Sequence, residues 1–257
     1  MKKRSELKFA GIIPARYTSS RFPGKPLAMI NGKPMVQRVY EQSRKSLDTV
    51  FVATDDKRIF DAVKNFGGNA VMTSSEHQSG TDRCAEAIGR ISRKNGIEVD
   101  VVVNIQGDEP FIRPEEIDLL KSCFNDKNVE IATLIRKAAH GEDLFNPNQP
   151  KVVIDSLGNA IYFSRAAIPF IRNLGESLWS ENFTFYKHLG LYAYTIRALK
   201  RITKLPVSYL EKAEALEQNR WIENGYRIRS AVTEWESIGI DTPADLDRAL
   251  LYFENLK

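Results

Sequence analysis

The sequence predicts an α/β fold with a mostly parallel central sheet, flanking helices and a small antiparallel extension. Short apolar runs alternate with helical patterns through the first half of the chain, which is typical of βαβ units. The run DVVVNIQGDEP at residues 100–110 is apolar enough for a strand that is covered on both faces. After about residue 131, strands joined by turns replace this alternation. We therefore expect one domain over residues 1–257, with the extension at residues 131–195.

The parallel part is expected to consist of successive strand–helix pairs. Strands are expected at residues 9–14, 49–56, 70–74 and 100–110, and helices at residues 34–47, 57–66, 82–94 and 114–124. Gly67 and Gly68 stop the second of these helices. Pro114 suits the first turn of the last one, because the missing N–H is not needed there.

The second half begins with strands and ends with helices. Strands are expected in IATLIRKA, KVVIDSLGNAIYFSRA and HLGLYAYT, with a loop-rich segment near residues 169–187. One helix is expected at residues 209–224, where Ser208 and Glu211 have the spacing of a capping box. A strand in RIRSAV and a closing helix at residues 244–256 follow, and Thr242 is placed to cap that helix.

The composition indicates a globular protein with a locally basic site. The chain has 257 residues, of which 42% are hydrophobic and 27% charged, so it can bury a full core and is neither disordered nor fibrous. Its 37 basic and 33 acidic residues give a net charge of +4 and are spread along the chain. A dedicated nucleic-acid binder would concentrate its basic residues on one face. No nucleic-acid partner is therefore expected.

The sequence also bears on location. Cys84 and Cys123 are the only cysteines, and no Cys/His group has zinc-binding spacing, so a disulfide framework is not expected. The apolar stretch near the amino end is interrupted by Pro14 and Arg16, unlike the apolar region of a signal peptide. No run approaches the roughly 18 apolar residues of a membrane span. We expect a cytoplasmic protein that does not enter a membrane.

A cluster of cations follows the first strand directly. IIPARYTSSRFPGKPL contains Arg16, Arg21 and Lys25. Ligands of open α/β sheets bind beyond the carboxyl ends of the strands, and backbone N–H groups and cations there suit phosphate. The segment lacks the glycines of a dinucleotide fingerprint, and Pro26 after Lys25 departs from the common triphosphate-binding loop. The alternative is a solvated basic loop, but the position favours phosphate binding.

Carboxylates follow two other predicted strands. NIQGDEP places Asp108 and Glu109 just past the most apolar strand, and IGIDTPADL places Asp241 at the end of another. Carboxylates, water and substrate phosphates are the ligands that Mg²⁺ prefers, so the two aspartates are candidates to share one ion. The alternatives are an acidic capping turn at the first position and a helix start at the second.

The motif HQSGTDR is a candidate for reading a base. Its Ser79–Gly80 turn can offer backbone groups to a base edge, and the helix after it carries Arg83 toward phosphate. A plain junction between a loop and a helix explains the same residues equally well.

Two more motifs contain candidate binding residues. HLGLYAY has His188 and Tyr192 at even spacing, which puts both on one face of a strand; a structural histidine is the alternative. ALEQNR places Glu217 and Gln218 on an amphipathic helix, where a solvated face is the ordinary interpretation.

Taken together, these motifs resemble one family. IIPARYTSSRFPGKPL, HQSGTDR, NIQGDEPFI, YFSRAAIP, HLGLYAY, LEQNRW and GIDTPADL occur in the order found in the 3-deoxy-manno-octulosonate cytidylyltransferases, also called CMP-Kdo synthetases. The resemblance extends from about residue 8 to residue 251. The departures are a longer amino end, Asn219 where a leucine is usual, and Trp235 shortly before the last motif.

The resemblance implies a function and an assembly. It implies a Rossmann-like nucleotide-diphospho-sugar transferase fold and a homodimer, with the dimerisation and sugar-binding extension at residues 131–195. The implied reaction joins CMP to 3-deoxy-D-manno-octulosonate (Kdo): CTP and Kdo give CMP-Kdo and diphosphate, for lipopolysaccharide synthesis in the cytoplasm. The implied cofactor is Mg²⁺.

The resemblance also implies roles for individual residues. Arg16 and Lys25 correspond to contacts with the CTP phosphates and, with Asp108, to the catalytic residues. Asp108 and Asp241 correspond to the Mg²⁺ ligands. The residues near the cytidine correspond to Ser79, Gly80 and Arg83, and those of the sugar pocket to Arg21, Gln106, Arg165, His188, Tyr192, Glu217 and Gln218.

Two alternative functions stay open from the sequence. One is a cytidylyltransferase for sialic acid or for an amino-substituted Kdo, although HQSGTDR and QGDEP favour Kdo over sialic acid. The other is a nucleotide sensor without catalysis. The presence of both Asp108 and Asp241 argues against a sensor, which would not need two metal ligands.

Overall fold

The computed structural model describes residues 7–18, 21–235 and 239–254. The chain divides into two compact units, the first from Met1–Asp118 and Ser237–Lys257 and the second from Leu119–Glu236. The second unit begins before the predicted extension at residues 131–195 and ends after it, and a single domain stays a prediction. No helix of the described segments is both long and apolar enough to span a bilayer.

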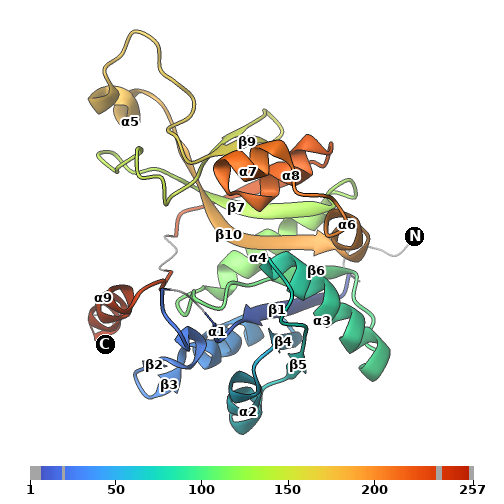
Figure 1. The fold of residues 1–257 in the computed structure, drawn as a ribbon. Coiled ribbons are helices and arrows are strands. Elements are labelled where there is room, and N and C mark those ends of the chain that lie inside the picture. Colours follow the sequence, from blue (N-terminus) through green and yellow to red (C-terminus); the bar gives the residue numbers. More distant parts are fainter. Residues whose placement is uncertain (1–6, 19–20, 236–238, 255–257) are drawn as a thin grey trace. The chain divides into compact units, whose positions relative to one another are not determined.

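The first unit contains a parallel sheet with the strand order β6-β1-β4-β5. These strands are Val101–Asn104, Phe9–Ala15, Thr49–Thr54 and Ala70–Met72 in that order. The chain passes from β1 to β4 and β5 before it returns to β6 on the other side of β1 (Figure 1). The predicted parallel strands are confirmed, and the order of the strands reverses between β1 and β6.

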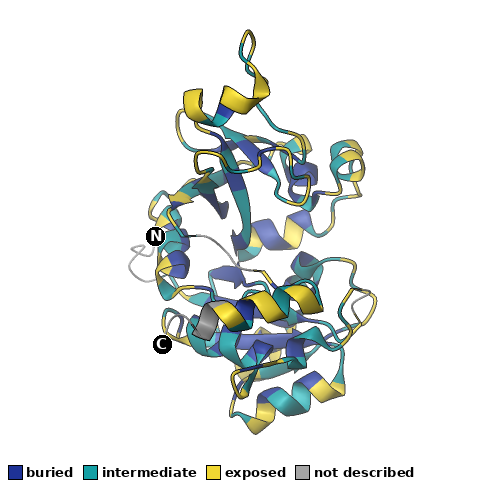
Figure 2. Cartoon of the chain, turned by 90° about the vertical axis from the view of Figure 1, so that its left-hand side faces the viewer, coloured by how far each residue is buried: buried dark blue, intermediate teal, exposed yellow. Residues whose placement is uncertain are grey.

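Helices connect and cover these strands. The predicted helices correspond to α1 (Met35–Arg44), α2 (Lys57–Asn65), α3 (Gly80–Asn95) and α4 (Pro114–Ser122). Figure 2 shows that the strands are largely buried and that the helices expose one face. The sequence did not predict the short hairpin of β2 (Met29–Ile30) and β3 (Lys33–Pro34).

The strand expected at residues 100–110 is shorter than predicted. β6 ends at Asn104, and the rest of the segment is a turn that crosses the end of β1. Gly107 makes this crossing possible, because a Cβ atom at that position would lie 2.8 Å from the carbonyl oxygen of Pro14. Asp108 therefore lies beyond the strand end, as expected.

The second unit is mostly antiparallel. β7 (Ile131–Lys137) pairs with β10 (Tyr186–Thr195) antiparallel and with β11 (Ile228–Thr233) parallel. β8 (Lys151–Ile154) pairs antiparallel with β10 and with β9 (Ala160–Ser164). The predicted fold class, a mostly parallel sheet with an antiparallel extension, is confirmed.

Helical turns link the strands of the second unit. The loop-rich segment contains α5 (Trp179–Asn182), and α6 (Ile196–Ile202) follows β10 directly. The sequence predicted neither of these helices.

The helix expected at residues 209–224 is broken in two. α7 (Tyr209–Glu214) and α8 (Glu217–Glu223) are separated at Ala215, whose φ angle of 50° lies in the left-handed region. The predicted capping box of Ser208 and Glu211 is present at the start of α7.

The closing helix α9 belongs to the first unit and spans Pro243–Glu254. Thr242 caps it by accepting a hydrogen bond from the Asp245 N–H at 3.2 Å. The last two residues of the predicted helix, 255 and 256, lie outside the described part of the chain.

Candidate active site

The candidate site of the first unit lies where the strand order reverses. β1 and β6 are neighbours, but their following segments leave the sheet toward different helices. Such a switch point leaves a crevice at the carboxyl ends of the strands, where ligands of open α/β sheets bind. Arg16 follows β1 and Asp108 follows β6, so both are carried to this edge.

One lysine holds two carboxylates together. The ammonium group of Lys25 lies 2.7 Å from an oxygen of Asp108 and 3.1 Å from an oxygen of Asp241. Gly24 positions it, with a φ angle of 73° and an N–H that donates to the Tyr17 carbonyl at 2.8 Å. The structure thus brings together three predicted residues that are far apart in the sequence.

Backbone pairing and a second cation complete this cluster. The N–H of Ile240 donates to the carbonyl of Asp108 at 2.9 Å, which fixes the two acidic segments against each other. The guanidinium of Arg21 lies 3.1 Å from Asp241 and is well exposed. Arg21 therefore borders the cluster from the solvent side.

The donor chemistry of this cluster fits a divalent cation. Two carboxylates that converge on one ammonium can also converge on Mg²⁺, which commonly takes one or two carboxylates and completes its shell with water and phosphate oxygens. Across the residues that the structure describes, no cluster of three or more His, Cys, Asp or Glu side chains forms a fuller protein cage. A site that binds the ion together with a phosphate ligand is consistent with this short set.

Arg16 reaches the segment of the predicted base-reading turn. Its guanidinium donates to the carbonyl of His77. Burial, and then the positive charge of Arg83, lowers the pKa of Arg16. The carboxylates of Asp55 and Asp82 act in the opposite direction, so Arg16 lies in a mixed field of charges near the start of α3.

The predicted turn itself is the start of α3. The hydroxyl of Ser79 caps the helix by accepting from the N–H of Asp82 at 3.1 Å, and Gly80 is the first helical residue. Arg83 is fully buried and donates to Thr73 at 2.6 Å and to Asp55 at 3.0 Å. The Arg83 side chain is therefore held by protein contacts with β4 and β5 neighbours, Asp55 and Thr73. Its predicted contact with a nucleotide stays a prediction.

Asn104, the last residue of β6, was not selected from the sequence. Its side chain is 2% exposed, and its Oδ1 has no hydrogen-bond partner in the described structure. Its position at the end of the most apolar predicted strand was the one sequence feature that could have identified it.

The second unit holds a neutral polar cluster around β10. The rings of His188 and Tyr192 lie 5.2 Å apart, as expected for one strand face. Burial lowers the pKa of His188 to about 3, so the ring is neutral near pH 7. Burial also raises the pKa of the Tyr192 hydroxyl.

The hydrogen bonds of Thr133 indicate the tautomer of His188. The Thr133 hydroxyl lies 2.9 Å from the carbonyl of Leu191, to which it donates its single proton. The same hydroxyl lies 3.3 Å from the carbonyl of Leu189 and 3.1 Å from Nε2 of His188. With its proton on the shortest of these contacts, the carbonyl of Leu191, the hydroxyl accepts from Nε2. Nδ1 of His188 is then a hydrogen-bond acceptor.

α8 adds amide and indole donors within the same unit. Gln218 is 5% exposed and its Nε2 has no hydrogen-bond partner among the described residues, so the interpretation of a solvated face is wrong for this residue. Glu217 lies 3.2 Å from Arg220. Trp221, which the sequence reasoning missed, packs edge-on against Tyr192 with ring centroids 5.2 Å apart.

Arg165 has a clear structural function. Its guanidinium donates to the carbonyls of Glu214, Pro147 and Ala215, at 2.7, 2.8 and 3.2 Å. These bonds stabilise the break between α7 and α8. Its predicted contact with a sugar stays a prediction.

The remaining sugar-pocket candidates lie in the first unit. Gln106 belongs to the turn after β6, where its carbonyl accepts from the Glu109 N–H at 3.3 Å. Arg21, described above, is the other.

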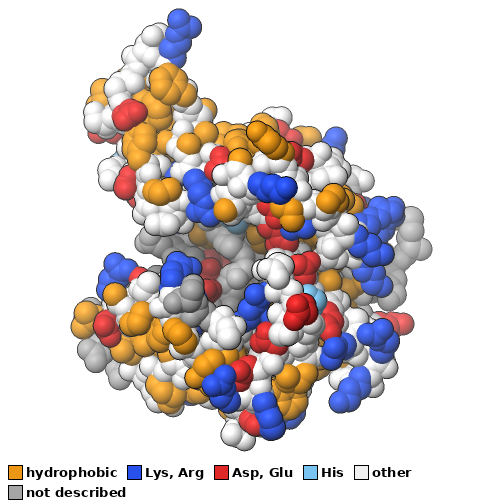
Figure 3. Space-filling view, in the orientation of Figure 1, with side chains coloured by type: hydrophobic (Ala, Val, Ile, Leu, Met, Phe, Trp, Pro, Cys, Tyr) orange, Lys and Arg blue, Asp and Glu red, His pale blue; other side chains and the backbone are white. Residues whose placement is uncertain are grey.

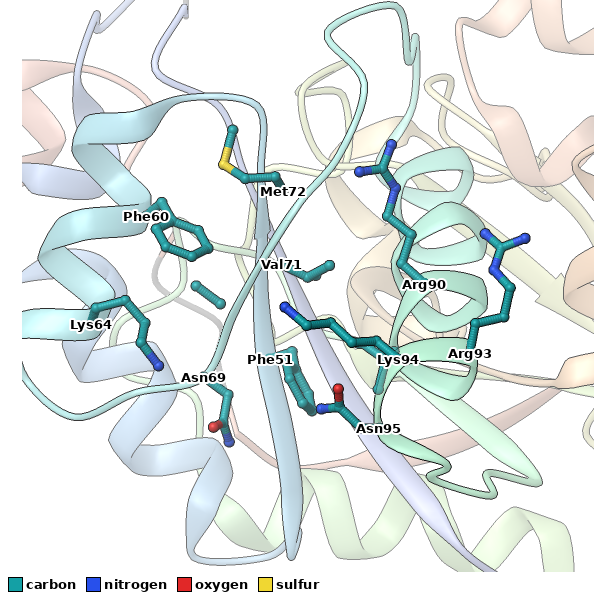
Figure 4. Close-up of a pocket in the computed structure, with 12 residues that line it drawn as sticks. Phe51, Phe60, Lys64, Asn69, Val71, Met72, Arg90, Arg93, Lys94 and Asn95 are labelled. Atoms are coloured by element: carbon teal, nitrogen blue, oxygen red, sulfur yellow. The ribbon is translucent and has the colours of Figure 1, made fainter.

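A groove of about 920 Å³ in the first unit contains none of the predicted site residues (Figure 4). It lies along β5, which pairs only with β4 in the described part of the sheet. The cations that line it are Lys64, Arg90, Arg93 and Lys94. Cations beside an open sheet edge discourage pairing with a strand of another chain. This accounts for the cations of the groove, and no ligand is needed to explain them.

The fold and the cluster at the switch point define a class: an α/β protein that binds a nucleotide and transfers part of it. The family model described as Cytidylyltransferase matches residues 10–229. A 3-deoxy-manno-octulosonate cytidylyltransferase of Parabacteroides distasonis is 58% identical, covering 97% of this chain and 99% of the relative. One of Bacteroides thetaiotaomicron is 55% identical, with the same coverage.

A solved structure agrees with these relatives. A CMP:2-keto-3-deoxy-manno-octonic acid synthetase complexed with CTP is 40% identical and superposes with a TM-score of 0.88, covering 97% of this chain and 100% of that one. The chain belongs to the 3-deoxy-manno-octulosonate cytidylyltransferase family.

Proposed function

We propose that the protein activates Kdo by the reaction CTP + Kdo → CMP-Kdo + diphosphate, for lipopolysaccharide synthesis. The observation that carries the proposal is the Lys25 ammonium between Asp108 and Asp241, at the sheet edge where a nucleotide is expected. The complex of the solved relative with CTP supports the same choice of nucleotide.

The first unit is proposed to bind the triphosphate. Arg16 and Lys25 supply fixed positive charge against the phosphates, and the N–H groups at the start of α3 add partial positive charge. These groups offset the negative charge that develops on the leaving diphosphate. Catalysis in this account is positioning and electrostatic stabilisation, with no covalent nucleophile.

Asp108 and Asp241 are the proposed ligands of Mg²⁺. A bound divalent cation would neutralise phosphate charge beyond what the side chains supply. Lys25 neutralises the same two carboxylates. We therefore expect Lys25 and the cation to compete for them, and the phosphates of CTP to favour release of the ammonium.

The second unit is proposed to bind the hydroxyl groups of Kdo. Nδ1 of neutral His188 can accept from a hydroxyl, and the unpaired Nε2 of Gln218 can donate to one. Buried polar atoms without partners cost about 1–3 kcal/mol each, so a ligand that pairs them gains affinity. Arg21 remains the candidate for the Kdo carboxylate, because its planar fork suits a bidentate contact.

A homodimer is proposed from an exposed aromatic surface in the second unit. Phe170 is 74% exposed and packs edge-on against the buried Trp179, with ring centroids 5.2 Å apart. Phe183, 44% exposed, packs the same way on Phe185. Hydrophobic side chains gather over this α5 segment in Figure 3. Light scattering should show a dimer for the native protein and a monomer for Phe170→Glu.

The reaction is tested by diphosphate release from CTP with a panel of 2-keto sugar acids. The expected result is release with Kdo well above that with sialic acid or with an amino-substituted Kdo. Preference for the amino sugar would assign the other acceptor. CTP binding without release from any acceptor would indicate a nucleotide sensor. A cytoplasmic location remains a proposal that fractionation of cells would test.

A further inference from the structure

Asn104 is a buried polar side chain that the fold does not satisfy. It is 2% exposed, and its Oδ1 has no hydrogen-bond partner in the described structure. It ends β6 and is paired with Ile12 of β1, three residues before β1 ends at Ala15. The carboxyl ends of these two strands form the switch point, where a ligand binds.

The Asn104 amide lies against the start of α3. A Cβ atom at Gly80 would be 3.7 Å from Nδ2 and 3.8 Å from Oδ1 of Asn104. Gly80 is the first residue of the helix, and Ser79 is its cap. The amide of Asn104 and the turn that caps α3 therefore lie side by side.

Another buried asparagine, Asn219, shows how such a group can be satisfied within the fold. Asn219 is fully buried; its Nδ2 donates to the carbonyl of Phe163 at 2.9 Å, and its Oδ1 accepts from the Phe163 N–H at 3.3 Å. An unpaired buried acceptor costs about 1–3 kcal/mol, so the contrast with Asn104 needs an explanation. A group that arrives with a ligand is the explanation that its position favours.

We infer that Oδ1 of Asn104 accepts a hydrogen bond from the exocyclic amine of the cytosine base, and so helps to select the nucleotide. This inference rests on the proposed function, in which CTP binds to the first unit. Cytosine has an amine donor on its pairing edge, whereas uracil has a carbonyl oxygen at that position. An unpaired acceptor at the turn matches cytosine. A buried hydrogen-bonding site rejects a ligand that leaves it unpaired.

The first test replaces the amide by an apolar group of similar size and compares two ligands. Asn104→Leu should bind CTP at least tenfold more weakly than the native protein, by calorimetry. It should bind inorganic tripolyphosphate, which has no base, within twofold of the native protein. Its melting temperature without ligand should be equal or higher, because an unpaired acceptor has been removed from the interior.

Asn219→Leu is the matched control. It should lower the melting temperature, because both polar groups of Phe163 lose their partner, and leave CTP binding unchanged. If Asn104→Leu binds CTP as well as the native protein does, or loses tripolyphosphate to the same degree as CTP, the inference is wrong.

The second test changes the ligand, so it does not depend on the folding of a variant. A pyrimidin-2-one ribonucleoside triphosphate lacks the exocyclic amine and keeps the rest of CTP. The native protein should bind it about tenfold more weakly than CTP, whereas Asn104→Ala should bind the two equally. UTP should follow the amine-free analogue. Equal affinity of the native protein for all three would overturn the inference, while diphosphate release with Kdo would still test the proposed reaction separately.

Discussion

The two candidate clusters, one in each unit, differ in charge. In the first, Lys25 pairs with two carboxylates that remain partly exposed, and Arg21 lies beside them in solvent. In the second, the cluster of His188, Tyr192 and Gln218 is neutral, and His188 is held without charge by desolvation; the charged Lys187 of β10 pairs instead with Glu142. Charges beside water can exchange partners with a charged ligand at low cost, whereas buried neutral groups can only exchange hydrogen bonds. The difference suits a triphosphate in one unit and sugar hydroxyls in the other.

The largest expected effect comes from removing charge in the first unit. Asp108→Asn and Asp241→Asn should each lower turnover about 10²- to 10³-fold, since each removes an electrostatic contribution to the reaction. The double variant should be little worse than either one, because groups that act together are not additive. Steady-state turnover at saturating Mg²⁺ measures this, with circular dichroism as the check on folding. Activity near the native level in either single variant would remove that residue from the metal site.

The next effect concerns the neutral state of His188 in the second unit. The pKa of His188 is lowered from 6.5 to about 3 by burial, so below pH 6.5 the unfolded chain binds a proton that the folded protein does not. The part of the free energy of unfolding that is linked to His188 is therefore fully present above pH 6.5. It is lost as the pH falls from 6.5 toward 3, by up to about 1.4 kcal/mol for each pH unit.

Denaturant unfolding across this pH range measures that loss. His188→Gln should reduce the slope of stability against pH between 6.5 and 3. An unchanged slope in the variant would show that His188 is not held neutral.

A smaller effect is expected at Asn219, which binds both backbone groups of Phe163. Asn219→Leu should cost about 1–3 kcal/mol, because two buried backbone groups lose their partner. Urea unfolding measures this, and an equally stable variant would show that the surroundings satisfy Phe163 by another route.

The smallest effect tests the competition at the carboxylates. Lys25→Met removes the ammonium but keeps most of the apolar stem. Without nucleotide it should bind Mn²⁺ about tenfold more tightly than the native protein, about 1.4 kcal/mol, because the two carboxylates lose their resident cation. Electron paramagnetic resonance reports the free ion directly. Arg21→Gln, which removes only an exposed partner of Asp241, should change Mn²⁺ affinity little. Unchanged or weaker Mn²⁺ binding in Lys25→Met would mean that Lys25 and the ion do not share a position.

The sequence predicted the elements whose cause is local. Apolar runs predicted the strands, because a strand that is covered on both faces needs apolar side chains on both. The spacing of Ser208 and Glu211 predicted the capping box. The break at Ala215 was not visible, since an alanine in the left-handed region has no mark in the sequence. α6 was missed because its cap, Thr195, is also the last residue of β10, with no turn residue between them.

The site was predictable to a similar extent. Charged residues expected after strands led to Lys25, Asp108 and Asp241. Asp108 does follow β6, but the expected strand before Asp241 is wrong for the described residues 239 and 240, and Asp241 lies just before α9. Asn104 and Trp221 were missed, because burial of a polar atom depends on contacts between distant segments. The motifs identified Arg83 and Arg165 as candidate binding residues. They did not predict that both side chains bind other protein groups, Asp55 and the carbonyl of Glu214.

The division of labour between the units is tested most directly by comparing Lys25→Met with His188→Leu. For each variant, CTP affinity is measured by calorimetry and the Michaelis constant for Kdo by steady-state kinetics. Lys25→Met should weaken CTP binding at least tenfold and change the Michaelis constant for Kdo little. His188→Leu should raise that constant severalfold and leave CTP affinity within twofold of the native protein. If both variants weaken CTP to the same degree, the charged and the neutral cluster do not serve separate substrates, and the account is contradicted.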